Sequence, residues 1–499
     1  MKLQKKIKIF SFIVITVLTV GFSACYKPVY YNGKEPVLSF SVDTILFDTV
    51  FSTVGSATKT LKVYNSLDKT VLLKSVYLAK GQNSKFRLNV DGIAGKEIDM
   101  VEIAPHDSIY VFAEVTIDPS QPLSASPFVV EDDLVFDMNG VEQRVKMHAW
   151  GQDANYLTGK SKGKVFITTC DMGTMVWDDP KPYVIYGTLL IDSCTVRIPE
   201  GTRIHVHGGF AKSESGVEYN DGQIYVLEHG KLQVEGSFEK PVIFATDRLE
   251  HKYDDISGLW SGIYILAGSK GNKIQHAVLK NANIGVYVDS LAELNISYSK
   301  ILHNITAGIY ARHAKVEATN CLITDSGAYG VILSYGGEYT FKFCTIAKYS
   351  GESSAVVLGN HHCLDVFCQT DLIHPVKAEF YNTIIHGSNE DEILFDNGCW
   401  PDYCNNAENF QYSFTNCLFV VKDLIGPKYY PDFFDYTQDC LNGAGENPLF
   451  IDPDKYDLRP DSLSIVRDKG IPLMGIEYDL KGNLRDGDPD LGCFEYRQE

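Results

Sequence analysis

Short runs of alternating apolar and polar residues fill most of the chain, and they are organised in two different ways. Between residues 36 and 153 the runs are separated by turn residues, as in Lys59–Asn65 and Ser108–Val115. Alternation is typical of a strand that has one face in a core and the other face in water. Turn signals at intervals of about 8–12 residues then favour an antiparallel β-sandwich over residues 36–153.

From residue 160 onward the alternation acquires a fixed period. Equivalent segments begin at spacings of 23, 21 and 23 residues, namely Ala277–Asn281, Lys300–Asn304, Cys321–Asp325 and Cys344–Ala347. A second apolar run in each of the first three repeats follows a glycine, at Gly285, Gly308 and Gly330. Such a period predicts a β-solenoid, in which equivalent residues of successive coils stack. We therefore expect Cys321 and Cys344 to be neighbours.

The first coils contain sequence motifs that are typical of a known architecture. Residues 195–206 (TVRIPEGTRIHV) and 240–244 (KPVIF) resemble the first coils of right-handed parallel β-helix proteins of the pectin-lyase-like fold. The resemblance implies a right-handed parallel β-helix, which we place at residues 160–440. Gaps of about 30–40 residues between the later repeats predict loops that project from the solenoid. The expected fold class is therefore all-β, with a sandwich followed by a β-helix.

Two further segments resemble parts of bacterial envelope proteins. Residues 51–56 lead into the strand ending at Asn65 as in hydin-type immunoglobulin-like domains, which present or space other domains. Residues 441–499 resemble the choice-of-anchor-type segment that ends bacterial β-helix proteins, although Cys493 replaces the usual Ala and Arg467 replaces Ile. Because a solenoid ends in unpaired strand edges, we interpret residues 441–499 as a C-terminal cap.

The first 24 residues have the pattern of an export signal. Four lysines within residues 1–8 precede an apolar run over residues 9–22, which is too short for a membrane span of ~20 residues. Phe22–Cys25 resembles a bacterial lipobox, although Phe22 stands where Leu is usual. The resemblance implies that Cys25 receives acyl chains, including palmitate, and begins a lipidated tether over residues 25–35. An ordinary signal peptide with an incidental cysteine is the alternative.

Composition narrows the class of partner. The 499 residues include 64 acidic and 45 basic side chains, which gives a net charge of −19. Nucleic acid requires a basic surface, so we expect no nucleic-acid partner. The lipobox resemblance instead implies the membrane as a partner, with the protein on the periplasmic or cell-surface face of an outer membrane. Abundant Gly, Tyr and Phe agree with a β-rich chain.

Eleven cysteines remain after Cys25, an odd number for a compartment that permits disulfides. Cys399 and Cys404 are disulfide candidates, and Cys363 and Cys368 have the same separation. Metal binding is the weaker alternative, because zinc sites usually contain closer cysteine pairs. Most of the remaining cysteines lie in apolar strand patterns and are expected to behave as small buried hydrophobic residues.

The catalytic sequence motifs of the pectate lyases and polygalacturonases are missing from the chain. The best candidates for a catalytic site are Arg312, His313 and Lys315, which follow one another around a turn, with Asp289 on the preceding coil. Arginine, lysine and histidine together could hold a uronate or a sulfate. The alternative is a solvated turn between strands.

Three other clusters are candidates for binding. The pairs His205/His207 and His361/His362 could ligate a metal, although surface positions are the alternative. Acidic turns at residues 452–457 and 486–490 could hold Ca²⁺, or they could be ordinary turns. Four aromatic residues in a long inter-coil segment could grip a sugar or a protein, or they could pack that segment on the solenoid: Tyr429, Tyr430, Phe433 and Phe434.

The leading hypothesis is a non-catalytic envelope lipoprotein that presents a β-helix for binding to glycan or to a protein partner. The alternative is a polysaccharide lyase or glycoside hydrolase with an unusual site. A third reading is a structural subunit of an envelope assembly. No cofactor is expected, and Ca²⁺ is the one ion that the acidic turns suggest.

Overall fold

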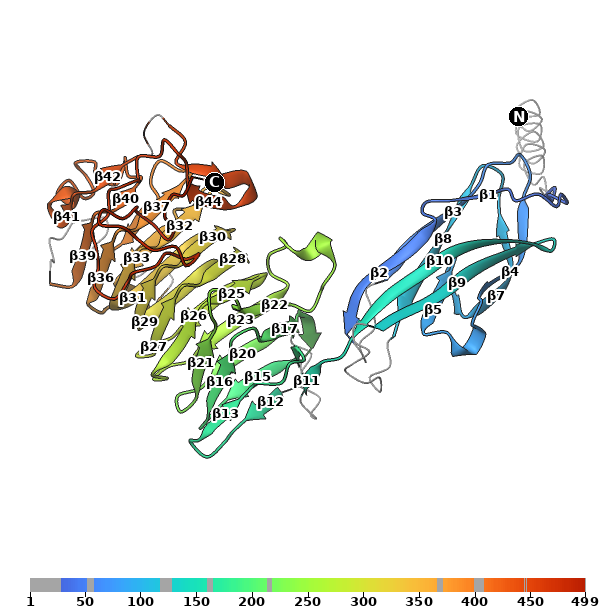
Figure 1. Ribbon diagram of the computed structural model, residues 1–499, viewed down its shortest axis with the longest axis horizontal. Coiled ribbons are helices and arrows are strands. Elements are labelled where there is room, and N and C mark those ends of the chain that lie inside the picture. The colour runs from blue at the N-terminus through green and yellow to red at the C-terminus, as the bar shows by residue number, and fades with distance from the viewer. Residues whose placement is uncertain are drawn as a thin grey trace, which may run out of the picture. The chain divides into compact units, whose positions relative to one another are not determined.

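The computed structural model describes residues 28–51, 58–116, 128–158, 165–212, 218–365, 371–398, 408–443, 445 and 447–498. Within these ranges the regular structure is β, with short 3₁₀ turns and no α-helix. No helix in the described ranges is long and apolar enough to cross a membrane. The chain divides into two compact units, residues 1–153 and 154–499, which are described separately (Figure 1).

The first unit is a sandwich of two five-stranded sheets. One sheet contains β1 (Leu38–Phe40), β3 (Lys59–Asn65), β8 (Ser108–Val115), β5 (Phe86–Val90) and β6 (Ile93–Gly95), in that order. The other contains β2 (Thr44–Phe51), β10 (Val141–Gln152), β9 (Phe128–Met138), β4 (Val71–Leu78) and β7 (Glu97–Ile103). The pairs are antiparallel except for β2 with β10. Alternate residues of each strand fill the core between the sheets, as the alternating pattern predicts.

The second unit is a parallel β-helix with three faces. An eleven-stranded sheet forms the first face: β11 (Asn155–Thr158), β14 (Tyr183–Tyr186), β17 (Arg203–His207), β22 (Val242–Thr246), β25 (Ala277–Lys280), β28 (Lys300–Asn304), β30 (Leu322–Ser326), β32 (Thr345–Lys348), β37 (Ile384–Gly387), β40 (Leu418–Phe419) and β42 (Leu441–Asn442). Every pairing between successive coils on this face is parallel.

A seventeen-stranded sheet forms the other two faces. We call one the tyrosine face: β12 (Val165–Thr168), β15 (Thr188–Ile191), β20 (Gln223–Val226), β23 (Trp260–Ile265), β26 (Ala282–Val288), the first halves of β29 (Ala307–Thr319) and β31 (Tyr329–Lys342), β33 (Val356–Gly359) and β38 (Ile393–Asp396). We call the other the charged face: β13 (Thr174–Val176), β16 (Thr195–Pro199), β21 (Lys231–Glu235), β24 (Asn272–Gln275), β27 (Glu293–Ser297), the second halves of β29 and β31, β36 (Val376–Tyr381), β39 (Phe410–Thr415) and β41 (Thr437–Gln438).

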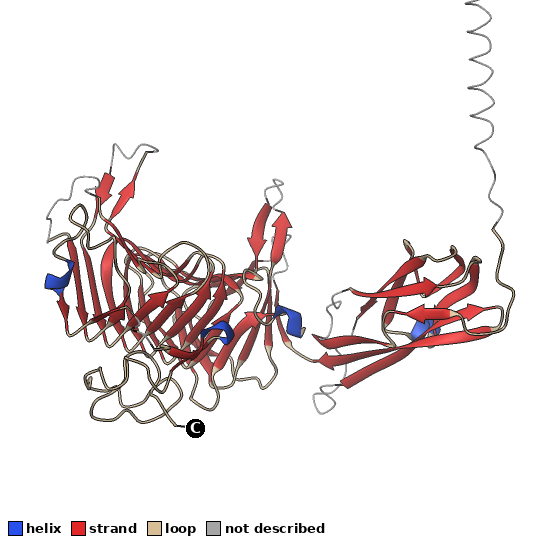
Figure 2. Ribbon diagram, turned by 90° about the horizontal axis from the view of Figure 1, so that it is seen from above, coloured by secondary structure: helices blue, strands red, loops and turns tan. Residues whose placement is uncertain are grey.

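Short elements lie outside the large sheets of the two units. The hairpins are β18 (Gly209–Lys212) with β19 (Glu218–Asp221), β34 (His361–Cys363) with β35 (Asp371–Ile373), and β43 (Phe450–Asp452) with β44 (Asp457–Pro460). The 3₁₀ turns are η1 (Gly81–Asn83), η3 (His251–Tyr253), η4 (Phe433–Tyr436) and η5 (Pro453–Lys455). Figure 2 shows two of the hairpins standing away from the stacked strands.

Equivalent residues stack inside the solenoid because the coils pair in register. The pairing Leu322 with Thr345 places Cys321 and Cys344 on adjacent coils, as the period predicts, and both thiols are buried. On the charged face the rings of Phe341, Phe380 and Phe414 stack inside the core, with centroids 5.1 and 4.8 Å apart. The expected all-β class, sandwich followed by β-helix, is confirmed.

One corner of the β-helix is a ladder of residues with left-handed backbone. Six residues that precede strands of the eleven-stranded face have φ between 48° and 51°: His276, Tyr298, Asn320, Phe343, Asn382 and Asn416. Asparagine tolerates this conformation better than most side chains, which explains its recurrence here. Three of these amides donate to carbonyl oxygens of the C-terminal segment, at Tyr478, Ile471 and Lys469, over 2.8–3.0 Å.

The C-terminal segment therefore lies along the flank of the solenoid. Outward-facing Leu322, Ala347, Ile384 and Leu418 of the eleven-stranded face pack against Leu449, Phe450, Leu458, Val466, Leu480, Leu491, Cys493 and Phe494. Figure 2 shows the loops of this segment following one side of the stacked strands to the C-terminus. Burial of this apolar face requires a lateral cover over several coils, and the segment supplies it.

Two polar residues of the C-terminal segment, Asp479 and Arg485, fix the conformation of its loops. The Asp479 carboxylate accepts hydrogen bonds from the backbone N–H groups of Lys481, Asn483 and Glu495. The buried Arg485 guanidinium donates to Glu495 and to Asn320 Oδ1, and it lies 3.8 Å from the centroid of Phe343. The contacts of Arg485 with Asn320 and Phe343 therefore anchor the C-terminal segment to the coils.

The end of the solenoid interior is closed by an aromatic plug. Phe433, at the start of η4, is fully buried and contacts the rings of Phe395, Phe414 and Phe419. Phe395 lies on β38, the last strand of the tyrosine face, and Phe414 and Phe419 lie on β39 and β40, the strands before the last on the other two faces. The segment between β40 and β41 thus closes this end of the interior, and the C-terminal segment, predicted as a cap, covers a flank of the coils.

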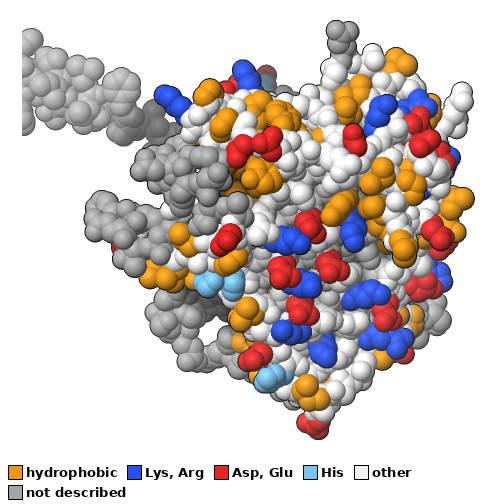
Figure 3. All heavy atoms as spheres, turned by 90° about the vertical axis from the view of Figure 1, so that its left-hand side faces the viewer, with side chains coloured by type: hydrophobic (Ala, Val, Ile, Leu, Met, Phe, Trp, Pro, Cys, Tyr) orange, Lys and Arg blue, Asp and Glu red, His pale blue; other side chains and the backbone are white. Residues whose placement is uncertain are grey.

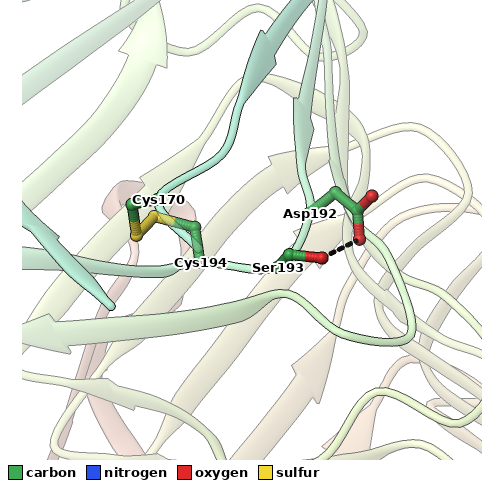
Figure 4. Close-up of a disulfide and its surroundings, with 4 residues drawn as sticks. All are labelled: Cys170, Asp192, Ser193 and Cys194. Atoms are coloured by element: carbon green, nitrogen blue, oxygen red, sulfur yellow. Dashed lines mark hydrogen bonds between the residues drawn. A yellow bond between two sulfur atoms is a disulfide. The ribbon is translucent and has the colours of Figure 1, made fainter. Parts of the chain in front are cut away.

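A disulfide ties the first two coils together (Figure 4). Cys170 lies between β12 and β13, Cys194 lies between β15 and β16, and the two are 24 residues apart. This pair was not among the predicted disulfides, although its separation of 24 residues is close to one coil. Cys399, Cys404 and Cys368 lie outside the described residues, and Cys363 is disulfide-bonded.

Replacing both members of this pair, Cys170→Ala with Cys194→Ala, should lower the free energy of unfolding by about 3 kcal/mol, because the unfolded chain loses a cross-linked loop. Urea unfolding monitored by fluorescence measures the change. Cys440→Ala, at a half-buried cysteine that forms no disulfide, is the matched control. A double variant no less stable than this control would contradict the expected role.

Candidate functional site on the tyrosine face

Four tyrosines occupy one outward position on consecutive coils. Tyr225, Tyr264, Tyr287 and Tyr310 pair in register on β20, β23, β26 and β29. Their ring centroids are 5.1, 5.7 and 5.3 Å apart along the stack. Partial burial of the rings raises the pKa of Tyr264 and of Tyr287 to about 12, so both hydroxyls are protonated donors at neutral pH. We call this row the tyrosine ladder.

A charged pair lies beside the end of the ladder. Asp289 and Arg312 each follow a ladder tyrosine by two residues, and they are neighbours on adjacent coils. Arg312 Nη1 lies 3.7 Å from Asp289 Oδ1, and Tyr287 donates to the same carboxylate over 3.4 Å. The ion pair is long and partly exposed, so it contributes little to stability and leaves donors of Arg312 available.

Histidines gather at the corner next to Arg312. The ring of His313 lies 4.2 Å from that of His374, and Tyr335 contacts both rings. His362 contacts Tyr335 from the β34–β35 hairpin, and the Arg312 guanidinium lies 4.8 Å from the Tyr335 centroid. A register shift between Arg312 and Ala314, with φ of 50° at His313, turns the chain at this corner.

His313 is poised as a neutral donor or acceptor. Its Nδ1 is buried and has no hydrogen-bond partner among the described residues. Burial lowers the pKa of His313, and the neighbouring His374 and Arg312 lower it further. A buried polar atom without a partner is costly, so this nitrogen makes the corner less stable than a fully hydrogen-bonded one.

The three catalytic candidates do not converge. Arg312 and His313 lie together beside Asp289, as the sequence analysis expected for the preceding coil. Lys315 lies beyond the corner on the charged face, where its ammonium is 3.9 Å from Glu338. The side chains of the tyrosine face and of the charged face therefore point in different directions.

The charged face is a flat mixture of both signs. Arg197 pairs with Glu235 and Lys377 with Glu379, each at 2.9 Å. Figure 3 views the molecule from the side on which β27, β29, β31 and β36 are labelled in Figure 1, and Lys/Arg side chains alternate there with Asp/Glu side chains. Such a surface is typical of a solvated wall.

The aromatic candidates divide into two pairs. Phe433 belongs to the core, and Tyr430 packs 4.9 Å from Phe395, so both support the end of the solenoid. Tyr429 and Phe434 are 38% and 45% exposed. Packing against the solenoid, the alternative stated for this insert, accounts for the first pair.

The metal candidates have protein partners. Nδ1 of the buried His205 bonds to the Thr246 carbonyl, and burial lowers its pKa to about 4; His207 pairs with Asp247 at 2.8 Å. His361 pairs with Asp396 at 2.9 Å, and Asp452 pairs with Lys455 at 2.8 Å. No group of three or more His, Cys, Asp or Glu residues in the described ranges is arranged to hold a metal ion.

Comparison with known proteins identifies the β-helix. A family model described as a right-handed beta helix region matches residues 183–346 and 261–409. No curated protein matches the chain. The solved structures similar to it include a protein of unknown function from Porphyromonas gingivalis W83, at 17% identity and a TM-score of 0.18. The match covers 26% of this chain and 50% of that one.

A second similar structure is the catalytic unit of a GH87 alpha-1,3-glucanase from Streptomyces thermodiastaticus, at 10% identity and a TM-score of 0.26. The match covers 77% of this chain and 75% of that one. A family 123 glycoside hydrolase from Clostridium perfringens matches at 6% identity and a TM-score of 0.18, over 37% of this chain and 44% of that one. These identities and TM-scores are too low to support a functional argument.

The tyrosine ladder was not among the predicted sites, although the sequence contains its signal. Tyr264, Tyr287 and Tyr310 each stand two residues after a glycine of the repeat. Aligning the coils on those glycines would have placed the three rings in one row. Tyr335 and His374 carry no comparable signal, because a turn and an irregular hairpin bring them to the corner.

We expect His374→Ala to raise the pKa of His313 toward its ordinary value, because the substitution removes a neighbour that repels the imidazolium and opens the ring to water. Since folding lowers this pKa, the contribution of His313 to stability falls as the pH drops below about 6.5. NMR titration of labelled imidazoles measures the shift. His251→Ala, at an exposed and distant histidine, should leave it unchanged, and an unchanged value in His374→Ala would contradict the assignment.

Proposed function

We propose that this chain is a lipid-anchored envelope protein whose β-helix binds glycan along the tyrosine ladder without chemical turnover. The observation that carries the proposal is the ladder itself, which ends beside Arg312 and His313. Aromatic rings bind the C–H faces of sugars, while hydroxyl groups at their edges exchange hydrogen bonds with sugar hydroxyls.

The spacing of the ladder favours an extended ligand. Each coil contributes one ring, and the ring centroids of successive coils are 5.1–5.7 Å apart. A pyranose unit in an extended polysaccharide advances by a similar length, so a chain running parallel to the axis meets successive tyrosines. A rigid row of rings also binds without a large loss of side-chain entropy, because neighbouring coils already fix each ring.

The chemistry of the corner favours an acidic group on that glycan. Arg312 offers a planar fork of donors beside the ladder, over the ring of Tyr335. A carboxylate or sulfate ester at this end of the ladder would meet those donors. Asp289 holds Arg312 loosely enough for such a group to compete.

The separation of the catalytic candidates supports binding over turnover. A lyase needs a base and a stabiliser of the enolate at one carbon, and a glycosidase needs two spaced carboxyl groups. Lys315 lies on a different face from Arg312, and the Asp289 carboxylate is engaged with Arg312 and Tyr287. The lyase or hydrolase reading remains the alternative that the binding experiment also tests.

The double variant Tyr264→Ala with Tyr287→Ala should weaken binding to polygalacturonate about tenfold, because it removes two stacking surfaces from the ladder. Arg312→Ala should weaken binding to polygalacturonate and dextran sulfate but not to a neutral β-glucan. Isothermal titration calorimetry on the purified protein measures the three affinities. Lys315→Ala is the matched control, because it removes a cation from the charged face.

Two outcomes would overturn this proposal. The first is equal affinity of the ladder variant and the unmodified protein for every polysaccharide. The second is the appearance of unsaturated or shortened products during incubation, abolished by Arg312→Ala, which would establish the lyase or hydrolase instead.

The proposed anchor rests on the lipobox-like residues and has its own test. Cys25→Ala should abolish incorporation of labelled palmitate and release the protein from the membrane fraction, because the acyl chains are the proposed attachment. Ser23→Thr keeps the cysteine and serves as the control. Membrane attachment that persists in Cys25→Ala would contradict lipid anchoring at this residue.

A further inference from the structure

The outer face of one sheet of the sandwich carries an exposed aromatic strip. Tyr110 and Phe112 alternate on β8 and are 47% and 40% exposed, with ring centroids 6.1 Å apart and an interplanar angle of 17°. Tyr64 on the adjacent strand β3 is 36% exposed. The rings of Tyr110 and Phe112 are stacked nearly parallel and partly exposed to solvent, and the Lys62 ammonium lies over the Tyr110 ring.

Polar groups border this strip on the same sheet. The Lys62 ammonium lies 5.2 Å from the Tyr64 centroid and 5.4 Å from that of Tyr110. Thr60 and Asn89 stand opposite Phe112 on the two flanking strands. Exposed aromatic rings with hydrogen-bond donors beside them are complementary to a pyranose, which has a C–H face and a rim of hydroxyl groups.

We propose that the strip of Tyr110, Phe112, Tyr64 and Lys62 is a second glycan-binding surface. The inference deepens the proposed function, since it takes the same class of ligand, but it rests on a separate unit and separate residues. It also gives the sandwich a binding role, where the sequence analysis gave it only a role in presentation.

The size and charge of the strip favour sugar over the other occupants. Three rings at these exposures offer roughly 250 Å² of surface, whereas a stable protein interface buries about 800 Å² on each partner. An anionic membrane surface requires clustered cations, but residues 28–153 contain 11 basic and 17 acidic side chains, a net charge of −6. A sugar chain needs neither a large area nor a basic surface.

Affinity electrophoresis of the whole protein in native gels provides the test, with hydroxyethyl cellulose and polygalacturonate as the embedded polysaccharides. Tyr110→Ala with Phe112→Ala should reduce the affinity for at least one of them about tenfold, because both stacking surfaces are lost. Tyr110→Phe with Phe112→Tyr keeps both rings and should retain the affinity. Leu46→Ala, at an exposed apolar residue of the opposite sheet, is the matched control, and thermal unfolding confirms that each variant folds.

The outcomes separate this inference from the proposed function. If only the ladder variant Tyr264→Ala with Tyr287→Ala loses affinity, the sandwich surface is wrong and the proposed function stands. If only the sandwich variant loses affinity, the inference stands and the ladder is wrong. If both variants keep the affinity of the unmodified protein, or if the protein binds no polysaccharide, the inference and the proposed function are both wrong. Loss of binding to phosphatidylglycerol vesicles alone would assign the strip to a membrane and overturn the inference.

Discussion

Parallel in-register pairing of successive coils is the constraint on which the second unit depends. Each coil forms its backbone hydrogen bonds with the coils before and after it, about 4.8 Å away, so each side chain stands over its equivalent. The same rule stacks phenylalanines inside the charged face and tyrosines outside the tyrosine face. A slip of one residue would exchange interior and exterior side chains, so the buried rows hold the exposed rows in place.

The architecture of the second unit was predictable because the repeat is visible in short stretches of sequence. Spacings near 22 residues, alternation within each run and recurring glycines all describe one coil, and the pairing of Leu322 with Thr345 follows from them. Contacts that cross the repeat were harder to predict. Arg485 bonds to Asn320 across 165 residues, and Phe433 enters the core from an irregular segment. Neither contact has a periodic signal in the sequence. The sequence therefore did not distinguish the C-terminal segment, which covers a flank, from the segment between β40 and β41, which closes the interior.

The candidate site was predictable only in part for a related reason. Arg312, His313 and Asp289 belong to the repeat, and their proximity follows from the coil spacing. The left-handed turn at His313 places Lys315 on another face, and an alternating pattern alone does not mark that corner. The disulfide between Cys170 and Cys194 has the coil spacing, but it lies before the repeat becomes regular.

The lateral cover formed by the C-terminal segment has a consequence for biogenesis. Coils can add one after another as a chain emerges from its N-terminus, since each coil needs only its predecessor. The apolar outer surface around Leu322, Ile384 and Leu418 is buried only when residues 449–494 dock beside the asparagine corner. Coils without that segment present an exposed apolar sheet face, which favours association with other chains.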